Sequence, residues 1–287
     1  MPREAYVNGR YVPHAQAAVH VEDRGYQFAD GVYEVVAIHG GALIDEDPHL
    51  DRLERSLTEL RIPMPMSRSA LKLIAREVIR RNGVRNGLVY MQVTRGVAPR
   101  DHKFPAGVRP SVVMTAREVK PHSAKMLAEG VAVVSVPDIR WARCDIKSVA
   151  LLPNVLAKQT AAEAGAQEAW QVDSDGMVTE GSSTNAWIVT GDRKVVTRAA
   201  TSAILNGITR LALIQLLEAE GLALEERPFS LEEAKAAREA FMTSSSSYVL
   251  PVTRIEDSPI GNGHPGLLTN RLRQIYMDYM AGVGGAA

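Results

Sequence analysis

The chain has 287 residues, of which 46% are hydrophobic and 23% charged, the ordinary balance of a globular protein. This length predicts about two domains, which together would bury roughly three quarters of the surface of the extended chain. Lysine plus arginine equals aspartate plus glutamate at 33 each, so no net field attracts nucleic acid or an anionic membrane. We therefore expect neither of these partners.

The cysteine count and the N-terminal residues bear on the compartment. A single cysteine, Cys144, excludes an intrachain disulfide, and the first residues contain no apolar stretch that resembles a signal peptide. The longest apolar run, "GVAVVSVP", has the length of a strand and falls well short of the ~20 residues that cross a bilayer. The histidines show no ligand spacing, so no metal site is expected. These observations predict a cytoplasmic protein.

Residues 1–119 predict a first α+β domain. Asn8-Gly9 and Gly40-Gly41 supply the positive φ angles that tight turns need, so two hairpins are expected there. The leucine spacing from Pro48 onward predicts a helix, and Ser67 is expected to cap a second one. The β-rich runs "GLVYMQVTRG" and "RPSVVMTAREV" then return the chain to the same sheet.

Residues 120–130 are expected to form a linker, since they contain a proline and have low β propensity. Residues 131–287 predict a second α+β domain. In chain order its expected elements are a strand at 131–141, a helix at 154–164, a hairpin at 168–181, a strand at 185–190, a helix at 207–220, a helix capped by Ser230 and Glu233, a strand at 240–252 and a helix from Leu267.

One lysine in "RCDIKSVALLPNVLAKQ" raises a chemical question, because Lys147 directly precedes an apolar run. An unpaired buried ammonium is costly, so this lysine either faces solvent or is kept for the chemistry of its amine. Further on, "MVTEGSSTN" places Glu180 at a strand end, and "LNGITR" opens a helix whose N–H groups can bind phosphate. Pyridoxal phosphate requires these three parts: an amine for a Schiff base, a carboxylate for the pyridine nitrogen and a helix N-terminus for the phosphate.

In this order the parts resemble the fold-type IV family of pyridoxal-phosphate enzymes. Within that family the D-amino-acid aminotransferases are most similar, on the strength of "EDRGYQFADGVYEVV", "VTRGVAPRDHKFP", "DIRWARCDIKS", "LAKQ", "VTEGSS" and "GITR". The resemblance covers nearly the whole chain. It implies an α+β fold of two domains, an N-terminal antiparallel sheet with helices and a C-terminal β-pseudobarrel that carries the cofactor lysine.

The resemblance also implies roles for individual residues. Lys147 would hold pyridoxal 5'-phosphate and move the substrate proton, and Glu180 would keep the ring nitrogen protonated. Arg52 would grip the phosphate. The other cofactor-binding residues implied are Ile208, Thr209, Ser244 and Ser245 at the phosphate, Leu205 on one ring face, and Ser183 and Thr184 on the other side.

A trap for the substrate α-carboxylate is implied as well, formed by Tyr33, Arg100 and His102. In the family the loop with "PRDHKF" comes from the partner subunit, which implies a homodimer. The chain departs from the family pattern at Ala29, Thr184 and Tyr248, which bears on side-chain preference.

The function implied is a ping-pong transfer of the amino group of a D-amino acid, such as D-alanine, to a 2-oxo acid, either 2-oxoglutarate or pyruvate. A branched-chain L-amino-acid aminotransferase and an (R)-amine transaminase are alternatives with a different carboxylate trap, and "PRDHKF" argues against both. Aminodeoxychorismate lyase shares the fold and would need no 2-oxo acid acceptor. A non-enzymatic carrier of the cofactor would have no use for the trap.

Overall fold

The computed structural model describes residues 3–285. Contacts divide the chain into two units. The first holds the residues up to Lys120, Ile146–Ala150 and the end of the chain from Met280, and the second holds Pro121–Asp145 and Leu151–Tyr279. The expected domain limits at residues 119 and 131 stay a prediction, but Ile146–Ala150, with the lysine expected in the C-terminal domain, belongs to the first unit. The expected linker contains a short helix, α4 (Ala124–Glu129), capped by the Ser123 side chain.

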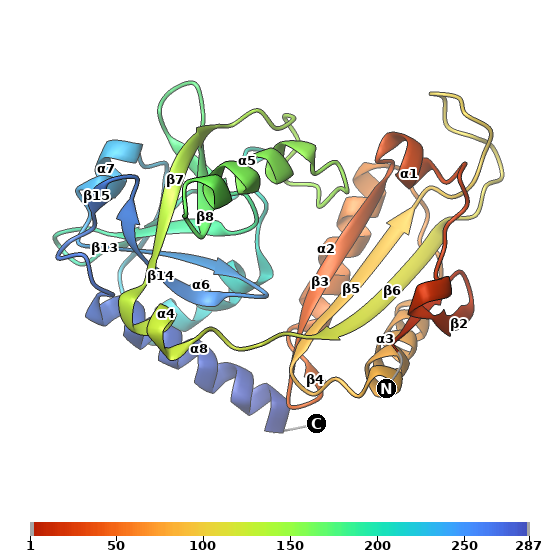
Figure 1. Ribbon diagram of the computed structural model, residues 1–287, viewed down its shortest axis with the longest axis horizontal. Helices are drawn as coiled ribbons and strands as arrows, with labels where there is room; N and C mark the ends of the chain where they lie inside the picture. The colour runs from red at the N-terminus through yellow and green to blue at the C-terminus, as the bar shows by residue number, and fades with distance from the viewer. Residues whose placement is uncertain (1–2, 286–287) are drawn as a thin grey trace. The chain divides into compact units, whose positions relative to one another are not determined.

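A six-stranded antiparallel sheet with the order β2-β1-β6-β5-β3-β4 forms the first unit (Figure 1). Its strands are β1 (Glu4–Val7), β2 (Arg10–Pro13), β3 (Gly31–His39), β4 (Ala42–Leu43), β5 (Gly87–Thr94) and β6 (Ser111–Glu118). Both expected hairpins are confirmed: φ is 46° and 93° at Asn8 and Gly9, and 62° and 99° at Gly40 and Gly41. Positive φ at both turn residues matches the right-handed twist of the paired strands.

Helices α2 (Glu46–Glu59) and α3 (Arg68–Asn82) cover one face of this sheet (Figure 1). Their leucines, alanines and β-branched residues share one apolar core with Val32, Val89, Met91 and Met114 of the strands. The expected cap is confirmed, since the Ser67 hydroxyl accepts a hydrogen bond from the Ala70 N–H at 3.2 Å. A five-residue helix, α1 (Arg24–Phe28), and a 3₁₀ turn (His14–Gln16) were not expected from the sequence.

A nine-stranded sheet forms the second unit, with the order β12-β11-β10-β13-β14-β7-β8-β9 and β15 beside β14. Its strands are β7 (Val131–Pro137), β8 (Glu168–Val172), β9 (Val178–Gly181), β10 (Asn185–Val189), β11 (Val195–Thr197), β12 (Leu224–Glu226), β13 (Glu239–Ser244), β14 (Tyr248–Ile255) and β15 (Ser258–Pro259). β9 ends the row of strands, yet a short turn joins it to β10 near the opposite end, and the Gly181 N–H donates to the Thr184 carbonyl at 2.7 Å. The sheet must therefore curl, which gives the expected pseudobarrel.

The strand expected at residues 240–252 is corrected to two strands. β13 and β14 pair as an antiparallel hairpin, and Ser245–Ser247 form the turn between them. Small hydroxylated residues suit a tight turn, because their side chains can bond the nearby backbone: the Ser247 N–H donates to the Ser244 hydroxyl at 3.1 Å. Tyr248 leaves the turn with φ at 57°, a conformation rare for a bulky residue.

The helices of the second unit agree in number and order with the sequence prediction, apart from α4 in the expected linker. They are α4, α5 (Leu152–Glu163), α6 (Ile208–Ala219), α7 (Leu231–Lys235) and α8 (Leu267–Gly285). The predicted cap of α7 is confirmed, with the Ser230 hydroxyl 3.0 Å from the Glu233 N–H. Among residues 3–285, no helix combines the length and the apolar character that crossing a bilayer requires.

Candidate active site

Lys147 lies at the open edge of β3 in the first unit. Its carbonyl accepts a hydrogen bond from the Tyr33 N–H at 3.0 Å, the Val149 N–H donates to the Gly31 carbonyl at 3.0 Å, and Ser148 faces Val32 in an antiparallel bridge. These bonds explain why the segment belongs to the first unit. Alternation along the segment buries Ile146 in the core and turns Lys147 to the sheet face away from α2 and α3.

On that face the amine of Lys147 meets aromatic rings. Its Nζ atom is 4.3 Å from the centroid of the Tyr33 ring, and Tyr33 stacks on Tyr90 with 5.7 Å between centroids. Burial and the neighbouring Tyr33 raise the pKa of Tyr90 to about 12, so its hydroxyl stays neutral. The structure thus brings Tyr33, expected in the carboxylate trap, next to the expected cofactor lysine.

Arg52 of α2 is fixed by a carboxylate, Glu34, that was not predicted from the sequence. Its Nε and Nη2 donate to Glu34 of β3 at 2.8 and 2.7 Å, and His49 Nδ1 lies 2.7 Å from the same carboxylate. Burial raises the pKa of Glu34, but the charge and hydrogen bonds of Arg52 and His49 outweigh it and lower the pKa to about 2. Glu34 is therefore ionised and orients the guanidinium. The signal was present in the sequence, because Glu34 interrupts an alternating apolar row on the core-facing side of β3.

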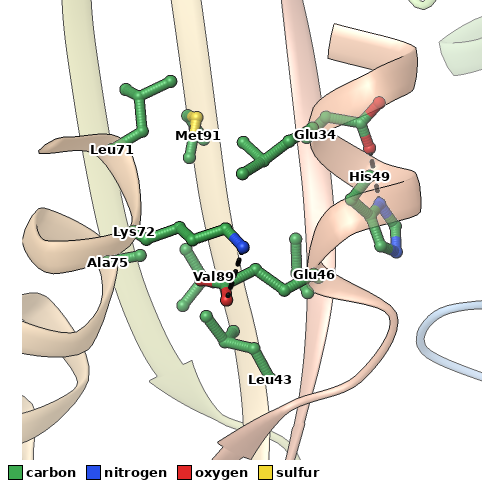
Figure 2. A pocket seen from close by; sticks show the side chains of 11 residues that line it. Glu34, Leu43, Glu46, His49, Leu71, Lys72, Ala75, Val89 and Met91 are labelled. Carbon is green, nitrogen blue, oxygen red and sulfur yellow. Dashed lines mark hydrogen bonds and ion pairs between the residues drawn. The ribbon is translucent and has the colours of Figure 1, made fainter. Parts of the chain in front are cut away.

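Glu34 and His49 also border a pocket between the sheet and the two helices, shown in Figure 2, with an empty volume of about 320 Å³ that includes open solvent. Its other walls are mostly apolar core side chains, and Lys72 and Glu46 form an ion pair of 3.7 Å across it. Lys147, Arg52 and the trap residues do not line it. This pocket is therefore not the candidate site.

Arg100 and His102 lie in the exposed loop between β5 and β6, and both pack on Phe28 of α1. The guanidinium carbon of Arg100 is 4.6 Å from the centroid of the Phe28 ring, and the His102 ring is 5.3 Å from it. Arg24 anchors the loop, since its Nη1 donates to the Asp101 carbonyl at 2.5 Å. No hydrogen bond, ion pair or ring contact joins Arg100 or His102 to Tyr33 in the part of the chain that the structure describes.

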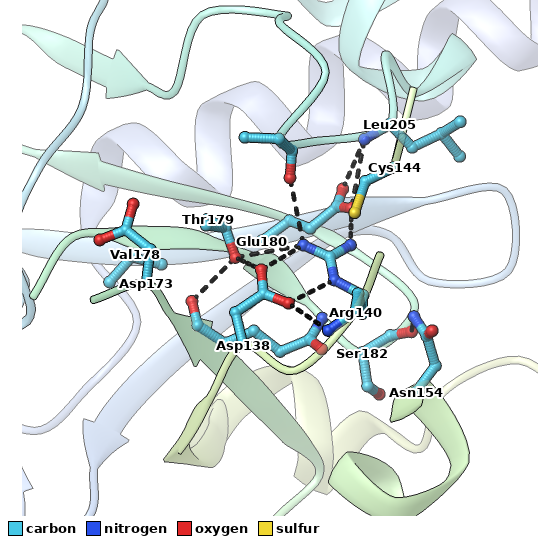
Figure 3. A network of polar contacts seen from close by, with 12 residues as sticks. Asp138, Arg140, Cys144, Asn154, Asp173, Val178, Thr179, Glu180, Ser182 and Leu205 are labelled. Atoms are coloured by element: carbon cyan, nitrogen blue, oxygen red, sulfur yellow. Dashed lines mark hydrogen bonds and ion pairs between the residues drawn. The ribbon is translucent and has the colours of Figure 1, made fainter. Parts of the chain in front are cut away.

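Glu180 is the residue before the last one of β9 in the second unit and is buried, with 6% of its surface exposed (Figure 3). The Leu205 N–H donates to both carboxylate oxygens at 3.2 and 3.1 Å, and the Asn185 side-chain amide donates to Oε2 at 3.0 Å. Donors of this kind favour the ionised form of a carboxylate over the protonated form. The structure therefore brings the expected residues Leu205 and Glu180 together, through the backbone of Leu205.

Arg140 also contacts Glu180, and no role was predicted for it from the sequence. Its Nη1 donates to Glu180 Oε1, while its Nε and Nη2 form a fork with Asp138 at 2.9 and 2.7 Å (Figure 3). Burial raises the pKa of Asp138, but the hydrogen bonds and charge of Arg140 lower it overall. The spacing "DIR" is a sequence signal for this pair, because an aspartate side chain readily bonds the residue two positions on, and here the Arg140 N–H also donates to Asp138 Oδ1 at 3.1 Å.

The start of α6 offers backbone donors. Its N-cap residue is Gly207, which has no side chain to accept a hydrogen bond from the first turn. The N–H groups of Ile208 and Thr209 at the start of the helix are therefore not capped by the N-cap residue. A Cβ on Gly207 would meet Asn185 Oδ1 at 2.2 Å, which ties this turn closely to the side chain that also holds Glu180. The backbone N–H groups expected to bind the phosphate in the second unit thus follow a glycine that packs against Asn185, the residue that also donates to Glu180.

Ser183 and Thr184 are held by a buried carboxylate that was also missed. Glu168 of β8 is fully buried and accepts from Ser183 Oγ at 2.9 Å, from Thr184 Oγ1 at 3.4 Å and from the Ser182 hydroxyl. This carboxylate fixes the turn between β9 and β10. Ser244 and Ser245 lie instead at the β13–β14 turn.

Neither a nucleophilic role for Cys144 nor a metal site is supported by the described residues. Burial raises the pKa of Cys144 to about 11, which keeps the thiol neutral and unreactive as a nucleophile. Residues 3–285 contain no cluster of three or more histidine, cysteine, aspartate or glutamate side chains that could hold a metal ion.

Comparison with known proteins identifies the family. The pattern of the class IV aminotransferases matches residues 31–255. The chain is 43% identical to a D-alanine aminotransferase of Bacillus licheniformis over 93% of both chains, and 37% identical to one of Staphylococcus epidermidis over 96% of this chain and 98% of the relative. A solved branched-chain amino acid aminotransferase of Escherichia coli superimposes with a TM-score of 0.89 at 25% identity, covering 97% of this chain and 94% of the other.

The fold is therefore that of the fold-type IV enzymes, as the sequence indicated. The chain belongs to the class IV aminotransferases.

Proposed function

We propose that this class IV aminotransferase transfers the amino group of a D-amino acid to a 2-oxo acid, with pyridoxal 5'-phosphate as its cofactor. Relatives named as D-alanine aminotransferases, at 37–43% identity over nearly the full length, support the substrate class. D-Alanine is the amino donor we favour, with 2-oxoglutarate or pyruvate as acceptor. The reaction is ping-pong, because one cofactor carries the amino group between two substrates in turn.

The observation that carries the proposal is the environment of Glu180. A buried carboxylate held by the Leu205 N–H, the Asn185 amide and Arg140 is a hydrogen-bond acceptor in a fixed position. That chemistry fits a protonated pyridine nitrogen, and the bound cofactor supplies a ring that accepts electrons from the substrate Cα. We assign Glu180 to the ring nitrogen.

Lys147 is the residue we assign to the cofactor carbonyl and to the proton at the substrate Cα. Its amine reaches the sheet face lined by Tyr33, and its backbone is bonded to β3, so the position of the amine is defined. A lysine amine can form the covalent link and then act as acid and base once the link is broken.

The phosphate is assigned to donors from several elements. Arg52 supplies a guanidinium oriented by Glu34, and the start of α6 supplies the N–H groups of Ile208 and Thr209. The Thr209 hydroxyl, Ser244 and Ser245 complete this set, Leu205 packs on one ring face, and Ser183 and Thr184 adjoin the other.

The substrate α-carboxylate is assigned to Tyr33, Arg100 and His102. Packing on Phe28 presents Arg100 and His102 together, as a carboxylate needs. We propose that they act on the cofactor of a second copy of the chain, within a homodimer.

Exposed apolar side chains support the proposed association of two copies of the chain. On α5, Leu152, Val155 and Leu156 are more than half exposed, and Ile139 before it is 62% exposed. A patch of large apolar side chains on one helix is typical of a protein interface. A cytoplasmic location stays a prediction.

Among the alternatives, a branched-chain L-amino-acid aminotransferase is supported by solved structures of that name at about 25% sequence identity. This identity is well below the 43% shared with a D-alanine aminotransferase.

The test is a single assay of D-alanine against L-alanine, each with 2-oxoglutarate, followed by chiral analysis of the glutamate formed. We expect D-glutamate from D-alanine and at least about a hundredfold lower rate with L-alanine. Equal rates with L-alanine, or pyruvate release without an acceptor, would contradict the proposed substrate class.

A further inference from the structure

Two carboxylates share one guanidinium in the interior of the second unit. Asp138 and Glu180 both contact Arg140, whose side chain is only 6% exposed. If all three side chains are ionised, Asp138, Arg140 and Glu180 together carry one net negative charge. Buried charges that are not balanced are costly, so this row of three side chains is suited to a fourth, positive group.

The other acidic groups near Arg140 in the described part of the second unit are neutral or have guanidinium partners of their own. Cys144 beside the row is neutral, because burial raises the pKa of its thiol to about 11. Asp145 is paired with Arg143 at 2.9 Å, and Asp173 is paired with Arg198 at 2.9 Å, so each of these carboxylates has its own guanidinium.

The geometry also fixes which way the guanidinium points. The fork to Asp138 uses Nε and Nη2, the Thr179 hydroxyl and the Ala203 carbonyl each lie 3.2 Å from Nη2, and Nη1 is directed at Glu180. Asp138 is itself held by the Thr179 hydroxyl at 2.7 Å. Arg140 therefore cannot turn away from Glu180 without breaking several bonds at once.

We propose that Arg140, oriented by Asp138, is a positioning residue that keeps Glu180 ionised and so keeps the proton on the cofactor ring nitrogen. The inference rests on the proposed role of Glu180. In the pair formed by the carboxylate and the ring nitrogen, one proton can sit on either partner. Arg140 contacts the carboxylate directly, so its positive charge favours the form in which the carboxylate is negative and the nitrogen holds the proton.

The test uses the holoenzyme loaded with pyridoxal phosphate that carries ¹⁵N in its ring, because the ¹⁵N chemical shift distinguishes a protonated from an unprotonated nitrogen. Wild type should show the protonated position at pH 7. Arg140→Gln should move the signal toward the unprotonated position, with the ratio of the two forms changed at least about tenfold, equal to one unit of relative pKa. Since the proton moves within the pair, that ratio should not vary between pH 6 and pH 8. Arg140→Lys keeps the charge and should give an intermediate shift.

The matched control is Arg198→Gln, which removes another partly buried arginine of the second unit from an ion pair with an aspartate. It should leave the ¹⁵N signal at the wild-type position. Thermal unfolding of each apoprotein separates loss of the fold from loss of the proton. If Arg140→Gln does not fold, Arg140→Met, which also removes the charge, decides, and a shift equal to wild type then overturns the proposal.

The outcomes separate this inference from the function on which it rests. Glu180→Gln should by itself move the ring nitrogen to the unprotonated position. If it does not, the role of Glu180 is wrong. If Glu180→Gln moves the signal and Arg140→Gln leaves it unchanged, only the role of Arg140 is wrong.

Discussion

The Lys147 amine lies 4.3 Å from the centre of the Tyr33 ring, and the backbone of the same two residues is joined by a 3.0 Å hydrogen bond. The residue proposed to hold the cofactor and a residue proposed to bind the substrate are thus fixed on one another. A change in either is expected to disturb both binding and chemistry.

Borohydride treatment of the yellow holoenzyme should attach the cofactor to the peptide that contains Lys147. A backbone hydrogen bond to β3 fixes Lys147 and so defines the position of its amine. Mass spectrometry of the digest locates the label, and Lys147→Arg serves as the control without it. A label on Lys158, or on no lysine, would contradict the assignment.

Gly207→Ala should weaken binding of pyridoxal phosphate by about tenfold or more. The new Cβ would collide with Asn185 Oδ1, 2.2 Å away, and overpacking of this kind costs about 1–3 kcal/mol. The dissociation constant is measured by fluorescence titration. Gly191→Ala is the matched control, since its Cβ meets nothing within 4 Å, and it should bind like wild type.

Glu34→Gln should destabilise the protein by about 3–5 kcal/mol at pH 7, because it leaves Arg52 without its buried carboxylate. The pKa of Glu34 is lowered to about 2 in the folded chain. Its contribution is therefore complete above its ordinary pKa of 4.5 and is lost as the pH falls toward 2.

Urea unfolding of wild type and variant at pH 7 and pH 3 checks this. The difference between the two proteins should shrink by roughly 2 kcal/mol at pH 3. Glu54→Gln, which breaks a more exposed pair with Arg68, should cost less than about 1 kcal/mol at pH 7. A Glu34 effect that is independent of pH would show that the carboxylate is not ionised in the folded state.

Hybrid dimers test whether Arg100 serves the neighbouring subunit. Subunits with Lys147→Ala and with Arg100→Ala, each carrying a different tag, are expressed together and the mixed dimer is purified. If the loop reaches the partner, one of the two sites keeps both residues, so the hybrid should show about half of wild-type activity, although both parent dimers are nearly inactive. An inactive hybrid would mean that each site is built within one chain.

Much of this architecture follows from local sequence signals. The turns at Asn8-Gly9 and Gly40-Gly41 and the caps at Ser67 and Ser230 were predictable, because short-range hydrogen bonds and positive φ angles determine them. The turn at Ser245–Ser247 that separates β13 from β14 was not predicted. The residues on both sides have high β propensity, and the turn contains no glycine or proline. Ala29 shows a similar limit: it ends α1 with φ at 54°, where a glycine would carry no strain.

The partners of the buried site residues could not be derived from motifs, although Glu34 stands out as a charged residue in an apolar row. Lys147 and Glu180 stand out because their neighbours in the sequence are distinctive. Glu34 and Glu168 act through side chains 18 and 15 positions away, on Arg52 and Ser183, so only the folded sheets bring them into contact. Arg140 lies 40 positions from Glu180 for the same reason.

The pairing of residues 146–150 with the start of β3 also bears on the order of events during synthesis. Until this segment has left the ribosome, the edge of β3 at Gly31–Tyr33 has no partner strand, and an open edge of this kind can pair with other chains. Contacts between parts so distant in sequence form slowly. The lysine segment is therefore among the last pieces of the first unit to be added, and a nascent chain that ends at Lys120 still exposes the edge that Lys147 will cover.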